Sequence, residues 1–226
     1  METSFLIFLL IGMVAMFIVM GIGCRTYGIP LWKIAVITAL LMPAGYYGAV
    51  TMCYIESGSW TGRSLYGAVF LVPIVMLPAA KLLKISYGEL MDVCAPAGCI
   101  MFALLKVKCK IDGCCKGRMM HIGDSSFVFP SQIVECVVFV IILFIIMYLL
   151  MKKQHQHKLY PIFMILYGAS RFFLNLLRET TPWIGPLPAG NFWSIVSVLI
   201  GITAILITNR SKTRSSINGK RRCLGR

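Results

Sequence analysis

Charged side chains are scarce in this sequence, and acidic ones are the scarcest. Only 13% of the 226 residues are charged, eight residues are acidic, and 58% are hydrophobic. A soluble domain of this size has too little interior to bury so much apolar surface. The composition therefore excludes a soluble globular protein and predicts a protein whose apolar surface is covered by lipid.

The apolar runs also lack any alternation of polar with apolar residues. Transmembrane strands need that alternation, because one side faces lipid and the other faces the lumen. The runs are instead about 20 residues long, the length that an α-helix needs to cross the hydrocarbon. We therefore predict an all-α, multi-pass membrane protein with about seven transmembrane helices. The expected spans are 5–22, 32–52, 65–82, 90–105, 133–151, 160–177 and 192–208.

No Lys or Arg precedes the first apolar run, whereas Arg25 and Lys33 follow it. A signal peptide would have its basic residues on the other flank, so we expect a first span with its N-terminus outside. The sequence has no internal repeat, low-complexity linker or second domain. We predict one transmembrane domain over residues 1–210 and a basic, disordered cytoplasmic tail over residues 211–226.

Basic residues gather on the side of the membrane that this topology places inside, as the positive-inside rule requires. The inner connections hold Arg25, Lys33, Lys81, Lys84, Lys152, Lys153 and Lys158. Much of the net charge of +14 belongs to the tail, which would contact anionic lipid headgroups. No aromatic residues are interleaved with these cations, so we predict no nucleic-acid partner.

One outer connection, residues 106–135, departs from this rule. It contains five cations, namely Lys106, Lys108, Lys110, Lys116 and Arg118. An anionic ligand would hold them on the outer side, and a phospholipid headgroup is the nearest candidate, since Lys and Arg bind phosphate by charge-assisted hydrogen bonds. The alternative is a solvated loop at the membrane interface.

A second basic group lies near the outer end of the sixth span. At 100° per residue, Arg171 lies about 40° and Arg178 about 20° around the helix from Tyr167, so the three share one face. A cation inside a span costs at least about 2.5 to 3.5 kcal/mol unless it finds a partner or water. Arg171 is therefore predicted to be functional, whereas Arg178 also fits a cation that extends to the interface.

Three motifs, read in order, resemble the prolipoprotein diacylglyceryl transferase family of bacteria. The first is MDVCAP at 91–96, followed by KVKCKIDGCCKGR at 106–118. The second is FPSQIVE at 129–135, and the third places Tyr167, Gly168, Arg171, Phe172 and Arg178 on the family's Tyr-Gly-x-x-Arg-Phe-x-x-Glu-x-x-Arg motif. The later segment GNFWSIVSVLIG resembles the family's last helix. The order of the three motifs is far more specific than any one of them.

The resemblance implies a seven-span protein, with its N-terminus outside, in the bacterial plasma membrane. Its reaction would move the diacylglyceryl group of phosphatidylglycerol, or a similar phospholipid, to the signal-peptide cysteine of a preprolipoprotein and release glycerol phosphate. This chemistry needs cations on the phosphate and a base for the thiol, but no cofactor. Tyr167 and Arg171 would lie close to the reacting groups. The implied phospholipid-binding residues are Lys106, Cys109, Asp112, Gly113, Gly117, Arg118, Gln132, Glu135, Asn175 and Arg178.

The sequence departs from the family pattern at positions that bear on catalysis. The signature arginine is Lys106, the asparagine is Cys109, and the glutamate of the third motif is Asn175. The family's His-Gly-Gly, its usual candidate base, aligns with Tyr66-Gly67-Ala68. Tyrosine keeps its proton at neutral pH and is a poor base. His121 is an alternative base, because histidine changes protonation near neutral pH; it is otherwise a solvated loop residue.

Three cysteines lie in the same outer connection. Cys109, Cys114 and Cys115 form, with His121, the pattern C-x4-C-C-x5-H. This spacing matches no standard zinc ligand pair, so no metal site is predicted, although zinc remains one alternative. A disulfide between Cys109 and one of the adjacent pair is another, and reduced thiols that pack near the lipid site are a third.

Two function classes follow. The first is a membrane transferase with Tyr66, Tyr167, Arg171 and His121 as candidate catalytic residues. The second is a non-catalytic or repurposed relative, such as a lipid-binding or thiol-redox membrane protein.

Overall fold

Each of the seven predicted apolar spans forms an α-helix in the computed structural model, which describes residues 2–122, 125–178 and 183–224. The helices are α1 (Glu2–Tyr27), α2 (Leu31–Ser57), α3 (Leu65–Leu82), α4 (Tyr87–Ile111), α5 (Ser131–Met151), α6 (Leu159–Leu176) and α7 (Ala189–Leu224). All seven contain a stretch long and apolar enough to cross a membrane. The prediction of an all-helical, multi-pass membrane protein is confirmed.

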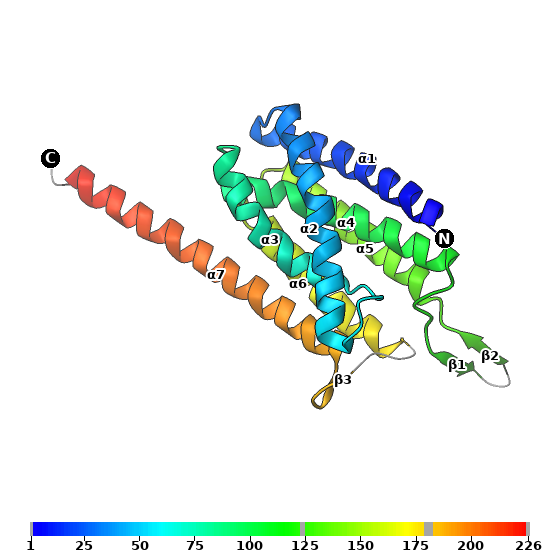
Figure 1. Cartoon of the computed structure of the whole chain (residues 1–226). Coiled ribbons are helices and arrows are strands. Elements are labelled where there is room, and N and C mark those ends of the chain that lie inside the picture. The colour runs from blue at the N-terminus through cyan, green and yellow to red at the C-terminus, as the bar shows by residue number, and fades with distance from the viewer. Residues whose placement is uncertain (1, 123–124, 179–182, 225–226) are drawn as a thin grey trace.

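Helix α4 lies at the centre of the bundle and contacts α1, α3, α5 and α6 (Figure 1). Helix α2 packs on α3, and α6 packs on α7. Two glycines bring α2 and α3 together, because a Cβ atom at Gly67 would lie 1.8 Å from the carbonyl oxygen of Gly48. Small residues at such crossings let helix backbones approach closely in membranes. This contact sets the position of Tyr66, the neighbour of Gly67.

Two short antiparallel hairpins were not predicted. Strand β1 (Met119–Ile122) pairs with β2 (Ser125–Val128), and β3 (Trp183–Ile184) pairs with β4 (Leu187–Pro188). Both hairpins lie at the end of the bundle where α4 and α6 end and where α3, α5 and α7 begin (Figure 1). We call it the hairpin end.

The fourth span is longer than predicted. Helix α4 continues from residue 105 to Ile111, so Lys106, Lys108 and Lys110 lie on a helix and not in a loop. Lysine is a good helix former, and cations near a helix C-terminus interact favourably with the helix dipole. The expectation of a loop that begins at residue 106 was therefore wrong.

The last helix also differs from expectation. Helix α7 extends to Leu224 and includes residues 211–224, for which we predicted a disordered tail (Figure 1). These residues include no proline, and their Arg and Lys residues favour helix formation. The last two residues of the predicted tail lie outside the described residues.

Candidate active site

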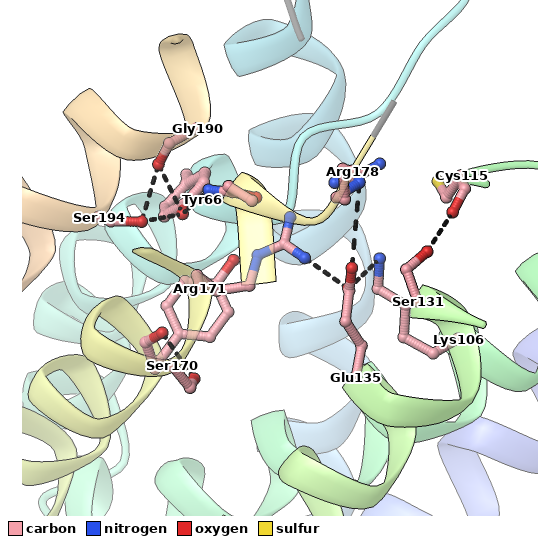
Figure 2. Close-up of polar contacts among 12 residues, drawn as sticks. Tyr66, Lys106, Cys115, Ser131, Glu135, Ser170, Arg171, Arg178, Gly190 and Ser194 are labelled. Carbon is pink, nitrogen blue, oxygen red and sulfur yellow. Dashed lines mark hydrogen bonds and ion pairs between the residues drawn. The ribbon is translucent and has the colours of Figure 1, made fainter. Parts of the chain in front are cut away.

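A single buried carboxylate at the hairpin end contacts three cations from three parts of the chain (Figure 2). Lys106 at the end of α4 places its Nζ 2.6 Å from Glu135 Oε2. Arg171 of α6 donates to the same oxygen, and Arg178 Nε lies 4.0 Å from Glu135 Oε1. We call these four side chains the charge cluster.

The charge cluster holds more positive than negative charge. Its three cations face one carboxylate, which leaves an excess of two positive charges. A second carboxylate, Glu56 of α2, interacts electrostatically with Arg171 and Arg178. It accepts a hydrogen bond from Ser64 at 2.8 Å. Even when Glu56 is included, the group remains cationic. Buried unbalanced charge is costly, so this arrangement favours the binding of an anion.

Several buried polar atoms in and around the charge cluster have no hydrogen-bond partner among the described residues. They are Glu135 Oε1, Tyr167 OH, Arg171 Nε, Asn175 Oδ1 and Arg178 Nε. Buried polar groups are normally paired, and each exception needs an explanation. The three donors among them, Tyr167 OH, Arg171 Nε and Arg178 Nε, favour a ligand with hydrogen-bond acceptors, such as an anion.

Tyr66 links three helices beside the charge cluster. Its hydroxyl donates to the carbonyl oxygen of Gly190 at 2.9 Å and shares a 2.6 Å hydrogen bond with Ser194 Oγ, both at the start of α7. The amide of Asn175 on α6 approaches the same hydroxyl at 3.4 Å, and Arg171 lies over the Tyr66 ring at 5.9 Å from its centroid. The phenol is therefore held by α7 and does not point freely into the site.

Tyr167 lies one helical turn before Arg171 and is fully buried. Its ring contacts Phe102, Phe139, Phe163 and Tyr66, with centroids 5.3 to 5.9 Å apart. Its hydroxyl has no hydrogen-bond partner among the described residues. Helical periodicity placed Tyr167, Arg171 and Arg178 on one helix face. Tyr167 and Arg171 do share a face of α6, but α6 ends at Leu176, so Arg178 lies beyond the helix and that part of the prediction was wrong.

The connection between α4 and β1 holds the backbone of Arg178, one member of the charge cluster. Gly117 pairs with Arg178 in an isolated β-bridge, and a Cβ atom at Gly117 would lie 2.3 Å from the carbonyl oxygen of Phe129. Arg118 is exposed, and its Nε donates to the carbonyl oxygen of Arg178 at 2.8 Å. Two predicted binding residues, Gly117 and Arg118, thus hold the backbone of Arg178.

The remaining predicted loop residues have local contacts. Asp112 pairs with Lys108 at 2.5 Å, and Gly113 adopts a left-handed turn with φ of 69°. The Gln132 amide donates to the Cys114 carbonyl oxygen at 2.6 Å. Lys106 and Lys108 thus both pair with acidic side chains of the protein. The expectation that an external anion holds all five cations therefore needs correction, because side-chain carboxylates partner two of them.

Cys109, Cys114 and Cys115 form a thiol cluster beside the charge cluster. All three are free, and their Sγ atoms lie within 4.8 Å of one another. A hydrogen bond from the Cys109 thiol, assisted by the charges of Lys106 and Arg178, lowers the pKa of Cys115 to about 5. The sequence placed these cysteines in one segment but did not indicate that they lie next to Lys106 and Arg178.

His121 is not part of either cluster. It lies exposed on β1, opposite Ser126, in a hairpin that projects from the bundle (Figure 1). The pattern C-x4-C-C-x5-H is therefore divided: its three cysteines come together, and its histidine lies on β1 outside that group. Sequence reasoning assigned no role to Ser131 or Ser194, although they lie within the segments FPSQIVE and GNFWSIVSVLIG.

Comparison with known proteins identifies relatives of this arrangement. The sequence model of the family described as prolipoprotein diacylglyceryl transferase matches residues 46–207. The phosphatidylglycerol–prolipoprotein diacylglyceryl transferase of Ehrlichia ruminantium is 28% identical over 168 residues, which cover 66% of this chain and 65% of the relative. The protein of the same name from Geobacter sulfurreducens is 26% identical, with 67% of this chain and 63% of the relative covered. The chain thus spans slightly less than two thirds of the length of these curated relatives.

Proposed function

The chain belongs to the prolipoprotein diacylglyceryl transferase family, and from this premise we propose that it transfers a diacylglyceryl group from phosphatidylglycerol to a prolipoprotein cysteine thiol. The charge cluster is the observation that carries this proposal. The phosphodiester of the lipid has one negative charge, and the glycerol phosphate that leaves has two. An excess of buried positive charge therefore binds the leaving group more tightly than the substrate, and such differential binding accelerates the reaction.

Each member of the charge cluster has a distinct role in this proposal. Arg171 and Arg178 contact the phosphate through planar guanidinium groups, whose geometry matches phosphate oxygens. Lys106 adds a point charge, and Glu135 orients the three cations before the lipid binds. The buried Tyr167 hydroxyl has no hydrogen-bond partner within the described part of the chain, so we assign it to the ester or phosphate oxygens.

An apolar groove supports the binding of a lipid. It has a volume of about 720 Å³ and lies between α3, α4, α6 and α7. It is lined mainly by apolar side chains, which include Val69, Phe70 and Met164, and it extends to Tyr87 and His157 at the end opposite the hairpin end. Val69 and Phe70 lie about one helical turn beyond Tyr66 on α3. We propose that acyl chains occupy this groove while the headgroup lies at the charge cluster.

We also propose that the hairpin end faces outward from a bacterial plasma membrane. The opposite end carries Arg25 in the last turn of α1, Lys81 in the last turn of α3, and Lys152 directly after α5. Positive residues favour the cytoplasmic side. This orientation gives the charge cluster access to secreted acceptors.

Transfer by the purified protein in phosphatidylglycerol nanodiscs tests the proposal. A lipobox peptide should gain a diacylglyceryl thioether, detected by mass spectrometry, and glycerol phosphate should appear in equal amount. Arg171→Gln should abolish the product, whereas Lys84→Gln, at the opposite end of the bundle, should not. Absence of both products with correctly folded protein would contradict the proposal.

A non-catalytic relative is the second candidate. The hydrogen bonds that hold Tyr66 to α7, the exposed position of His121 and the free thiol cluster favour it, because none of them supplies a conventional base. This candidate predicts bound phosphatidylglycerol without turnover, and a phenotype that follows Cys109, Cys114 or Cys115 and not Arg171.

A further inference from the structure

We propose that Cys109, Cys114 and Cys115 bind one Zn²⁺ ion, whose fourth coordination position takes the thiol of the acceptor cysteine. The assignment of the fourth position rests on the proposed transferase function; the metal site itself does not. The sequence pattern predicted no metal at these residues, and only the folded arrangement brings the three sulfur atoms together without the histidine.

The spacing of the sulfur atoms fits a soft metal ion. Zinc–sulfur bonds of about 2.3 Å in a tetrahedral site place sulfur atoms about 3.8 Å apart. The three Sγ atoms already lie within 4.8 Å of one another, and Cys114 is exposed, so a metal ion can enter from solvent. Small side-chain rotations therefore complete a three-thiolate site.

The backbone of the thiol cluster is held in place by the start of α5. Ser131 Oγ donates to the Cys115 carbonyl oxygen at 2.7 Å, and Gln132 Nε2 donates to the Cys114 carbonyl oxygen at 2.6 Å. The Cys114 N–H donates to the Cys109 carbonyl oxygen at 3.1 Å. Supporting hydrogen bonds of this kind orient metal ligands before the ion binds.

The surrounding charges suit the product of metal binding. Three thiolates and Zn²⁺ form a complex with one negative charge. Lys106 and Arg178 both act electrostatically on Cys115, and Lys106 acts on Cys109. The cations of the charge cluster therefore stabilise the complex.

The fourth coordination position remains available to a ligand. Within the described part of the chain, no further His, Cys, Asp or Glu belongs to the group of three cysteines. Catalytic zinc sites keep one position open in this way, whereas structural sites are closed. Ser131, which binds the Cys115 carbonyl oxygen, is one turn before Glu135 on α5, so the thiol cluster lies beside the charge cluster (Figure 2).

A thiol in the open position solves the problem of the absent base. A thiol that coordinates zinc loses its proton to solvent and becomes a thiolate. Its sulfur then forms a bond to the glyceryl CH₂ carbon of the phospholipid, and the bond between that carbon and the phosphate oxygen breaks. The electron pair leaves with glycerol phosphate, which the charge cluster holds. The thioether product is a weaker ligand than a thiolate and dissociates from the metal.

Metal binding is tested first, without any lipid reaction. Reduced, metal-free protein in nanodiscs is titrated with Co²⁺, which reports thiolate ligands by a charge-transfer absorption, and Zn²⁺ content is measured by elemental analysis. We expect about one ion per chain, and loss of the absorption in Cys109→Ser and Cys115→Ser. Cys53→Ser is the matched control, because its Sγ already lies 3.6 Å from Ser57 Oγ and outside the thiol cluster. Absence of the absorption in the parent protein, or its persistence in both variants, overturns the metal site.

The role of the metal is tested by a second set of measurements. Removal of zinc by a chelator should reduce transfer to the lipobox peptide at least about tenfold, and added Zn²⁺ should restore it, while bound phosphatidylglycerol stays unchanged. Peptide added to the Co²⁺ protein should shift the absorption, whereas a peptide with Ser in place of its Cys should not.

Transfer that is insensitive to the chelator overturns the activating role of the metal. Metal binding with no transfer under any condition overturns the proposed function and leaves the metal site in place. A disulfide within the thiol cluster of the isolated protein, with no metal uptake after reduction, overturns the site.

Discussion

Lys106 Nζ lies 2.6 Å from Glu135 Oε2 although the two residues are separated by an entire hairpin, and both side chains are at most 5% exposed. The pair joins the end of α4 to the start of α5 and brings Arg171 to the same carboxylate. The central position of Glu135 leads to the first prediction.

Glu135→Gln should destabilise the protein by about 3 to 5 kcal/mol, because it leaves three cations near one another without their carboxylate. The free energy of unfolding in detergent measures this loss. Glu89→Gln is the control, since Glu89 lies in the first turn of α4 and should contribute less than about 1 kcal/mol. Lys106→Met combined with Glu135→Gln should recover part of the stability. Equal losses for the Glu89 and Glu135 variants would contradict a central role for Glu135.

Arg171 should be more sensitive to geometry than to charge. Arg171→Lys keeps the cation but loses the planar pair of donors, and we expect a decrease in kcat of about 10- to 100-fold, or roughly 1.4 to 2.8 kcal/mol of transition-state stabilisation. Arg171→Gln should lose more. Steady-state release of glycerol phosphate gives both values. A lysine variant as active as the parent would show that only charge matters at this position.

Tyr66→Phe separates a structural role from a catalytic one. The variant loses the hydrogen bonds to Gly190 and Ser194, so the free energy of unfolding should fall by about 1 kcal/mol, while kcat remains within about threefold of the parent. Ser194→Ala should have a similar effect on stability. A loss of transfer in Tyr66→Phe but not in Ser194→Ala would instead identify the phenol as a catalytic group.

Gly117→Ala should reduce transfer although residue 117 makes no ion pair. The added Cβ would lie 2.3 Å from the Phe129 carbonyl oxygen, so the backbone that pairs with Arg178 must shift. A displacement of about 1 Å can cost about 100-fold in rate. Gly21→Ala is the matched control, because nothing lies within 4 Å of its added Cβ. The ratio of kcat between the two variants gives the result; equal rates would contradict a positioning role for Gly117.

The amino-acid sequence by itself determined the seven helices. The thickness of the hydrocarbon sets the length of an apolar span, and lipid requires each backbone polar group to pair within the chain, so composition and run length are sufficient. Helical periodicity likewise placed Tyr167 and Arg171 on one face, because residues four apart are neighbours in any α-helix. The order of the motifs also indicated the family from local residue types.

The chemistry of the site was decided only by the tertiary structure. The cations of residues 106–118 suggested an external anion, but Lys106 and Lys108 pair with Glu135 and Asp112, since helix α4 continues past residue 105. The position of Tyr66 against α7 depends on contacts between residues more than 100 positions apart. The three cysteines and His121 are close in sequence, yet the histidine lies in the β1–β2 hairpin and is not part of the group that the three thiols form. Periodicity and spacing describe one element at a time, whereas an ion pair or a metal site depends on how several elements pack.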